Sequence, residues 1–198
     1  ALAWRALSPF GVEIDRDLAA PLTEDETGQL RCLLRDHGLV LARNQELSMQ
    51  RQQEICALFG PILLREGENG TMSNEGGGPS ASALNWHSDA AYTDHPFDAL
   101  SLHALDVVDD ASSTCFVSAE SGLERLPGDL RQVLEGRSQE MIAPHYTVLG
   151  ETTCDRRDPP AQKRGVMPAI YRNPHSGRNC LWVNAMQTAR LLDMAWED

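Results

Sequence analysis

Several features are scarce in this 198-residue chain, and each scarcity excludes a class of protein. Cysteine occurs five times without any Cys-x-x-Cys spacing, so neither a disulfide framework nor a thiolate zinc site is indicated. We expect no secretory leader, and no apolar run approaches the about 20 residues that a membrane helix needs. Basic residues number 17 against 29 acidic ones, which disfavours nucleic acid and anionic membranes as partners. We therefore expect a cytoplasmic protein that binds neither.

The overall composition is that of an ordinary globular protein, and we predict one domain spanning residues 1–198. A capping box, Thr23 answered by Glu26, predicts the start of a helix that ends at Gly38. A buried strand is expected at residues 39–42. A second helix is expected from Ser48 to about Phe59.

The remaining elements are shorter. We predict helical structure at residues 118–136, interrupted at Pro127, and a turn at 173–177. The glycine-rich stretch 65–82 is expected to be a mobile active-site loop, and 150–165 a surface excursion. Early helices followed by short strands predict an α+β protein with helices packed on a β-sandwich or barrel. The expected strands are residues 85–92, 98–108, 113–118, 168–171 and 179–184.

The sequence Asn-Trp-His-Ser-Asp-Ala-Ala-Tyr at residues 85–92 contains the candidate metal ligands. If the segment is extended, His87 and Asp89 point to the same face. A histidine and a carboxylate are two thirds of the facial triad of non-haem Fe(II) oxygenases. An HxD tripeptide also occurs by chance, so this spacing alone leaves a surface or hydrogen-bonded histidine as an alternative.

The order of motifs along the chain extends this interpretation. Five segments follow one another: the helix-then-strand at residues 23–48, Phe-Gly-Pro-Ile at 59–62, the HxD segment at 85–92, residues 123–136, and residues 173–184. In this order the chain resembles the taurine dioxygenase and 2,4-dichlorophenoxyacetate dioxygenase family of Fe(II)- and 2-oxoglutarate-dependent oxygenases. The resemblance implies a double-stranded β-helix (jelly-roll, cupin-like) core with flanking helices.

The resemblance also implies roles for individual residues. His87 and Asp89 look like the first two iron ligands, and Thr114 looks like the threonine that hydrogen-bonds the 2-oxoglutarate carboxylate. A carboxylate held next to a metal gains from such a short hydroxyl donor. The implied cofactors are Fe(II) and 2-oxoglutarate, with no catalytic residue beyond the metal ligands.

The implied reaction is hydroxylation or oxidative cleavage of a small anionic molecule, with release of succinate and CO2. Asn85, Tyr92 and Asn184 are the candidate substrate contacts. Ala83 stands where taurine-type members use an asparagine to hold the sulfonate, which argues against taurine itself. Gln187 stands where relatives often carry an aromatic ring. Relatives of this kind often form homo-oligomers.

One departure from the family pattern concerns the metal site. The family completes its triad with a distal histidine and follows it with an arginine, and no residue here matches either, so we expect the C-terminal part of the domain to be missing from this chain. The other histidines are more simply interpreted as surface or hydrogen-bonded residues. They are His37, His95, His103, His145 and His175.

Two alternatives follow from the incomplete triad. The chain could be a catalytically silent binding or scaffold protein on the same fold. It could also be a zinc hydrolase in which His87 and Asp89 hold the metal, although no HExxH helix supports that chemistry.

Overall fold

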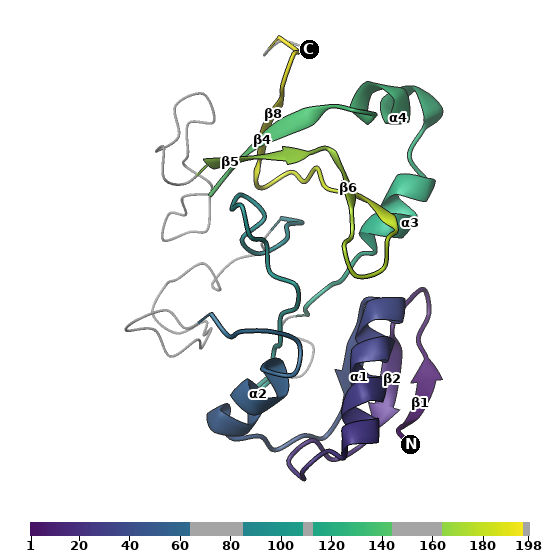
Figure 1. Ribbon diagram of the computed structural model, residues 1–198, viewed down its shortest axis with the longest axis vertical. Coiled ribbons are helices and arrows are strands. Elements are labelled where there is room, and N and C mark those ends of the chain that lie inside the picture. Colours follow the sequence, from purple (N-terminus) through teal and green to yellow (C-terminus); the bar gives the residue numbers. More distant parts are fainter. Residues whose placement is uncertain (64–84, 109–112, 144–163, 196–198) are drawn as a thin grey trace. The chain divides into compact units, whose positions relative to one another are not determined.

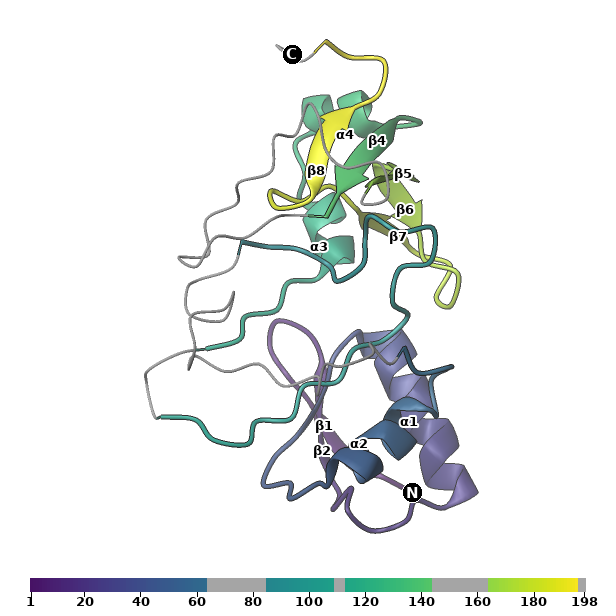
Figure 2. The same ribbon diagram turned by 90° about the vertical axis from the view of Figure 1, so that its left-hand side faces the viewer.

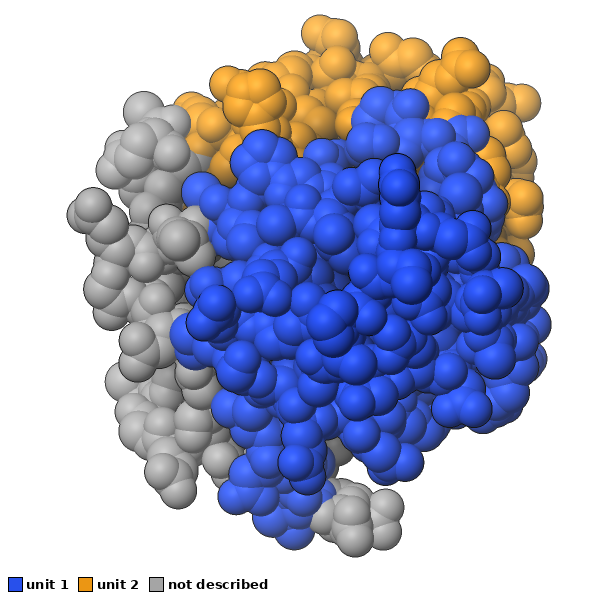
Figure 3. Space-filling view, turned by 60° about the horizontal axis from the view of Figure 1, so that its bottom comes forward, with its two compact units in different colours: residues 1–63, 98–118, 174–176 blue, residues 64–97, 119–173, 177–198 orange. Residues whose placement is uncertain are grey.

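The computed structural model describes residues 1–63, 85–108, 113–143 and 164–195, which form both helices and strands (Figure 1). They fall into two compact units (Figure 3). Unit 1 holds the described residues of 1–63, 98–118 and 174–176, and unit 2 holds those of 64–97, 119–173 and 177–198. The predicted loop at 65–82 and most of the excursion at 150–165 lie outside the described residues. Among the described helices, none is long and apolar enough to cross a bilayer.

Unit 1 is built on a three-stranded sheet with a helix on one face (Figures 1 and 2). Strand β2 (Val12–Asp15) lies in the centre, antiparallel to β1 (Ala3–Ala6) and parallel to β3 (Val40–Ala42). The helix α1 (Glu24–His37) connects the two parallel strands. Strand β3 confirms the strand expected at residues 39–42, although its residues are half-buried rather than buried. Strands β1 and β2 were not expected.

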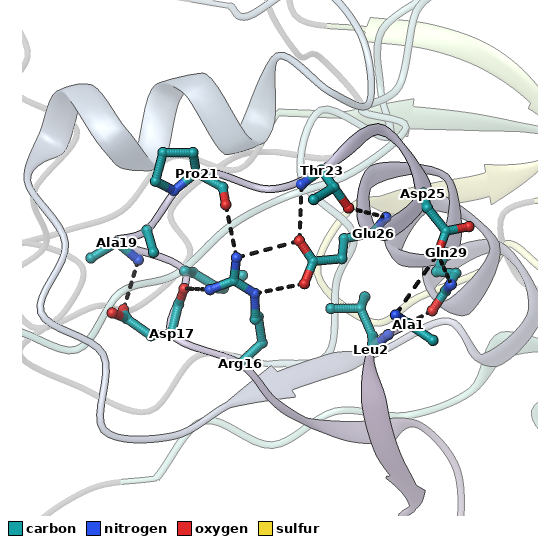
Figure 4. A network of polar contacts seen from close by, with 12 residues as sticks. Ala1, Leu2, Arg16, Asp17, Ala19, Pro21, Thr23, Asp25, Glu26 and Gln29 are labelled. Atoms are coloured by element: carbon teal, nitrogen blue, oxygen red, sulfur yellow. Dashed lines mark hydrogen bonds and ion pairs between the residues drawn. The ribbon is translucent and has the colours of Figure 1, made fainter.

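The start of α1 confirms the predicted capping box (Figure 4). The Thr23 hydroxyl accepts from the Glu26 backbone N–H at 3.2 Å, and the Glu26 carboxylate accepts from the Thr23 N–H at 2.9 Å. Arg16 Nε donates to the same carboxylate at 2.9 Å. Gly38 ends the helix with a φ of 73°, a left-handed conformation that glycine adopts at little cost. The helix therefore begins and ends where the sequence predicts.

A second helix, α2 (Met49–Cys56), belongs to the same unit, and Ser48 caps it by accepting from the Arg51 N–H at 3.1 Å. It ends three residues before Phe59, since Leu58 and Phe59 continue in a turn. Alternate residues of β2 and one face of α1 point into a shared apolar core, which removes their side chains from water. The buried core residues are Leu2, Val12, Ile14, Leu30, Leu33 and Ile55.

Unit 2 combines two short helices with two small sheets. The predicted helical stretch at 118–136 is confirmed as α3 (Ala119–Glu124) and α4 (Gly128–Leu134), with Pro127 at the N-cap of α4. Strand β4 (Ser138–Ile142) lies between β5 (Arg164–Pro168) and β8 (Thr188–Leu191), antiparallel to both. A separate hairpin consists of β6 (Ile170–Arg172) and β7 (Asn179–Leu181), which include parts of two predicted strands.

Strand β4 is the most enclosed element of unit 2. Gln139 and Met141 are fully buried, and Ile142 nearly so. The carboxylate of Glu140, between them, forms ion pairs with both neighbouring strands, with Arg164 of β5 at 3.3 Å and with Arg190 of β8 at 3.0 Å. Because β4 pairs on both edges, it fixes the positions of β5 and β8.

Three predicted strands are wrong: residues 85–92, 98–108 and 113–118 are turns, bends or irregular segments where described. An apolar run becomes a strand only where neighbouring backbone supplies ladder partners. Leu102, Leu105 and Phe116 illustrate this, because each side chain is more than half exposed. The 85–92 segment is bent by its own hydrogen bonds.

Candidate functional site

Residues 85–93 of unit 2 form two consecutive turns. The Ala91 N–H donates to the Ser88 carbonyl at 3.3 Å, and the Thr93 N–H donates to the Ala90 carbonyl at 3.0 Å. The Thr93 hydroxyl donates to that second carbonyl at 2.8 Å. Ala90 has a φ of 56°, and Ala91 is completely buried. Local hydrogen bonds and one buried methyl group thus hold the backbone of the candidate site.

The structure brings His87 and Asp89 together, although not through the strand geometry that suggested their pairing. His87 Nε2 lies 3.2 Å from Asp89 Oδ1. On the other side of the ring, Nδ1 lies 2.8 Å from the Asn85 carbonyl oxygen. A carbonyl can only accept, so Nδ1 bears the hydrogen and Nε2 is the atom that faces the carboxylate.

These contacts set the electrostatics of the pair. Hydrogen bonding to Asp89 raises the pKa of His87, and the Asn85 carbonyl acts in the same direction, while partial burial opposes both. The raised pKa favours a proton on Nε2, where it lies against the carboxylate. A metal ion that binds both groups must replace this proton.

The pair fits a divalent metal by two tests. Neighbouring ligands of an octahedral ion at about 2.1–2.2 Å are roughly 3.0 Å apart, close to the 3.2 Å between Nε2 and Oδ1. Histidines that bind metals also usually donate their other ring N–H to a carbonyl or carboxylate, as His87 does to Asn85. One nitrogen and one carboxylate oxygen suit Fe(II), which takes two histidines and a carboxylate in facial-triad sites.

Within the described part of the chain, no group of three or more His, Cys, Asp or Glu side chains could hold a metal. His103 Nε2 is instead 3.1 Å from the Gln45 carbonyl, and His175 Nε2 is 2.9 Å from Asp98. The ring of His37 lies 5.3 Å from that of Trp4. His95 is exposed, and His145 lies outside the described residues. These arrangements agree with surface and hydrogen-bonded roles.

The candidate substrate contacts also lie in unit 2. Asn85 is exposed and Tyr92 is half-buried, on either side of the ligand pair. Asn184 stabilises a turn: its side-chain oxygen accepts from the Met186 and Gln187 N–H groups at 3.1 and 2.8 Å. Its amide nitrogen donates to the Gln187 side chain at 3.1 Å. A substrate role for any of the three stays a prediction, and Ala83 lies outside the described residues.

Thr114 is an exposed residue of unit 1, in a segment without regular structure. The pair that it is predicted to serve belongs to unit 2. Its role toward 2-oxoglutarate therefore stays a prediction from the resemblance alone.

Two features of the site were missed by sequence reasoning. The first is Gly165 in β5, which lies against the backbone of Tyr92. A glycine inside a strand pattern is itself a signal for such a close approach. The second is a buried polar network: Thr188 donates to Gln139 at 2.7 Å, and its hydroxyl accepts from the Asn184 N–H. Buried Gln187 belongs to this network.

Comparison with known families finds one model that spans nearly the whole chain. Residues 4–195 match the model described as taurine catabolism dioxygenase TauD, TfdA family. The match includes every candidate site residue named above. It therefore concerns the site as well as the flanking elements.

Individual relatives agree with the family model. The chain is 26% identical to the alpha-ketoglutarate-dependent 2,4-dichlorophenoxyacetate dioxygenase of Cupriavidus pinatubonensis, over 88% of this chain and 69% of that protein. The structure of the present chain resembles that of AAD-2 in complex with Mn(II) and N-oxalylglycine, with a TM-score of 0.71 and 17% sequence identity. The match covers 100% of this chain and 74% of AAD-2. A taurine dioxygenase from Burkholderia xenovorans gives a TM-score of 0.68 at 18% identity, and the match covers 99% of this chain and 68% of that one. The mixed α/β fold is therefore that of these dioxygenases.

Proposed function

This chain belongs to the taurine catabolism dioxygenase TauD, TfdA family, and from that premise we propose its reaction and the residues that perform it. As a member, it is a 2-oxoglutarate-dependent dioxygenase whose cofactors are Fe(II) and 2-oxoglutarate. We propose that it hydroxylates or oxidatively cleaves a small anionic organic molecule. The observation that carries this proposal is the His87–Asp89 pair, with its 3.2 Å separation and its carbonyl-oriented ring.

The proposed reaction balances in atoms and electrons. One atom of O2 enters a substrate C–H bond as a hydroxyl group, and the other enters succinate as 2-oxoglutarate loses CO2. These two oxidations together supply the electrons that reduce O2. Where the hydroxylated carbon also bears an ether oxygen or a sulfonate, the product breaks at that bond. The bound Fe(II) supplies the centre at which O2 is activated.

The chain's own residues bind and orient the reactants. His87 would hold the metal through Nε2, and Asp89 would hold it through its carboxylate. The Asn85 carbonyl maintains the required tautomer of His87 by accepting from Nδ1 at 2.8 Å. Thr114 donates its hydroxyl hydrogen to a carboxylate of 2-oxoglutarate.

The names of the relatives support a proposal for the substrate class. Their names specify taurine and 2,4-dichlorophenoxyacetate, which carry a sulfonate and a carboxylate. An anionic substrate is therefore proposed here, in contact with Asn85, Tyr92 and Asn184. The alanine at position 83 argues for a substrate other than taurine.

The proposal extends to architecture. Residues 1–198 belong to one oxygenase domain with a double-stranded β-helix core, and the sheets of unit 2 contribute to that core. We further propose a cytoplasmic homo-oligomer.

An anaerobic titration tests the function. Fe(II) and 2-oxoglutarate are added to the purified protein, and the weak visible charge-transfer band of their chelate is followed. We expect a saturable band that disappears in His87→Ala and in Asp89→Ala. Matched controls are His95→Ala and Asp94→Ala, which remove the same side chains in the same unit and should retain the band.

The same titration evaluates a second candidate, a silent binding protein on this fold. That candidate is supported by the described residues, among which no three His, Cys, Asp or Glu side chains form a group that could hold a metal. If folded wild-type protein gives no band, the oxygenase proposal is wrong and the silent function is favoured. A band that survives both ligand substitutions would show that the metal binds elsewhere. Bound zinc with no response to 2-oxoglutarate would support a hydrolase.

A further inference from the structure

Gly165 lies where strand β5 meets the turn that holds the ligand pair. A Cβ atom added at this position would collide with the Tyr92 carbonyl oxygen. It would also stand 3.0 Å from the Tyr92 carbonyl carbon and 3.7 Å from the Thr93 nitrogen. These are backbone atoms, so a rotamer change cannot relieve the collision. Either β5 or the turn must move.

Strand β5 is the less movable partner. Gly165 pairs with Met141, which is fully buried in the central strand β4. The flanking residue Arg164 forms an ion pair with Glu140 of the same strand. Ladder hydrogen bonds on both edges of β4 hold this sheet together. A collision at Gly165 is therefore expected to displace the turn.

A displacement of the turn would also move the proposed metal ligands, because a few peptide bonds and two hydrogen bonds connect them to it. Tyr92 follows Asp89 by three residues, and the two turn hydrogen bonds connect Ser88 to Ala91 and Ala90 to Thr93. Ala91 is completely buried, so the turn has little freedom to tilt while keeping its contacts. Moving the Tyr92 carbonyl therefore changes the relative placement of the two ligands.

We infer that Gly165 is a positioning residue for the metal site, because its lack of a side chain allows the ligand-bearing turn to rest on the sheet. This inference rests on the proposed function, in which His87 and Asp89 bind Fe(II). Gly165 is not among the proposed metal ligands or substrate contacts. Its effect is exerted through the backbone of Tyr92.

The test measures metal binding rather than turnover. Co(II) is titrated into the full chain in the presence of 2-oxoglutarate, and its visible absorption reports affinity and ligand geometry. Gly165→Ala should weaken Co(II) binding by about 10- to 100-fold, as for partners that orient metal ligands, and should shift the absorption bands. The matched control is Gly128→Ala in the same unit, where an added Cβ meets nothing within 4 Å. It should bind Co(II) within about twofold of wild type.

The outcomes separate the two claims. Gly165→Ala with wild-type affinity and an unchanged spectrum overturns the inference but leaves the proposed function intact. Wild-type protein that binds no Co(II) overturns the proposed function and the inference with it. If Gly165→Ala does not fold, hydrogen exchange of the wild type decides. Co(II) should slow exchange in both 88–93 and 164–168, and protection confined to 88–93 would overturn the inference.

Discussion

The start of α1 and the turn at residues 85–93 both hold a carboxylate beside a basic group, but they use different kinds of contact. At the helix, Glu26 is held by Arg16 at 2.9 Å and by the Thr23 backbone at 2.9 Å, all close in sequence (Figure 4). At the turn, the ligand-bearing backbone rests on Gly165, in a strand much further along the chain. The helix start can form with few tertiary contacts, whereas the ligand pair depends on an assembled sheet.

This difference predicts which substitutions lower stability alone and which also lower metal affinity. Destabilising substitutions within unit 1 should lower the unfolding free energy without changing the geometry of the ligand pair. Destabilising substitutions in the β5-β4-β8 sheet of unit 2 should lower both the unfolding free energy and the metal affinity.

The largest effect is expected from Met141→Ala, since Met141 is fully buried opposite Gly165. Truncation of a buried methionine or leucine costs about 2–5 kcal/mol of unfolding free energy. Leu30→Ala, at a 4% exposed position in α1, is the matched control with a similar cost. In denaturant melts both should be destabilised, but only Met141→Ala should weaken Co(II) binding by about tenfold or more. Equal loss of affinity in both variants would contradict the contrast.

A smaller effect is expected at the N-cap of α1. Thr23→Ala removes the hydroxyl that accepts from the Glu26 N–H, and should lower the unfolding free energy by about 1 kcal/mol. Gly28→Ala in the same helix meets nothing within 4 Å and should raise it by about 0.5–1 kcal/mol. Denaturant melts measure both changes. Neither variant should alter Co(II) affinity, and a clear loss in Thr23→Ala would show that the helix start does influence the site.

Glu26 predicts a pH dependence with a definite sign. Hydrogen bonds from Arg16 and from the Thr23 backbone lower the pKa of Glu26 from 4.5 to about 2. A lowered folded-state pKa stabilises the protein above 4.5, and this contribution is lost as the pH falls through about 2. Glu26→Gln should therefore melt at a lower temperature than wild type near neutral pH, and the difference should shrink below pH 4.5. A difference independent of pH would contradict this assignment.

The helices of both units could be predicted because their signals are local. The capping residues Thr23 and Ser48 and the stop at Gly38 act on neighbouring backbone, so they are visible in sequence. Strands β1, β2, β4 and β8 could not be predicted in the same way. Their formation depends on backbone partners elsewhere in the chain. Gln139 shows the same dependence, since this buried polar side chain accepts a hydrogen bond from Thr188, 49 residues away.

The site was predicted for a reason that the structure does not support. His87 and Asp89 were expected to share one face of a strand, but a pair of turns brings them together. The left-handed Ala90 gave no sequence signal, because alanine rarely adopts that conformation. Gly165 could be recognised as unusual in a strand, but sequence alone does not identify the backbone that approaches it.

The smallest change in unfolding free energy is expected from glycine substitutions at two residues with left-handed backbone, one in each unit. Ala90 beside the ligand pair has a φ of 56°, and Asn44 in unit 1 has a φ of 54°. This conformation costs alanine about 1–2 kcal/mol but is tolerated by asparagine. Glycine removes that strain, although its greater freedom in the unfolded chain costs about 0.4–1 kcal/mol. Ala90→Gly should therefore raise the unfolding free energy by up to about 1 kcal/mol, whereas Asn44→Gly should leave it unchanged or slightly lower it. If Gly165 and Ala91 position the turn as inferred, Co(II) affinity should stay within about twofold of wild type in Ala90→Gly, since relief of strain leaves both contacts in place.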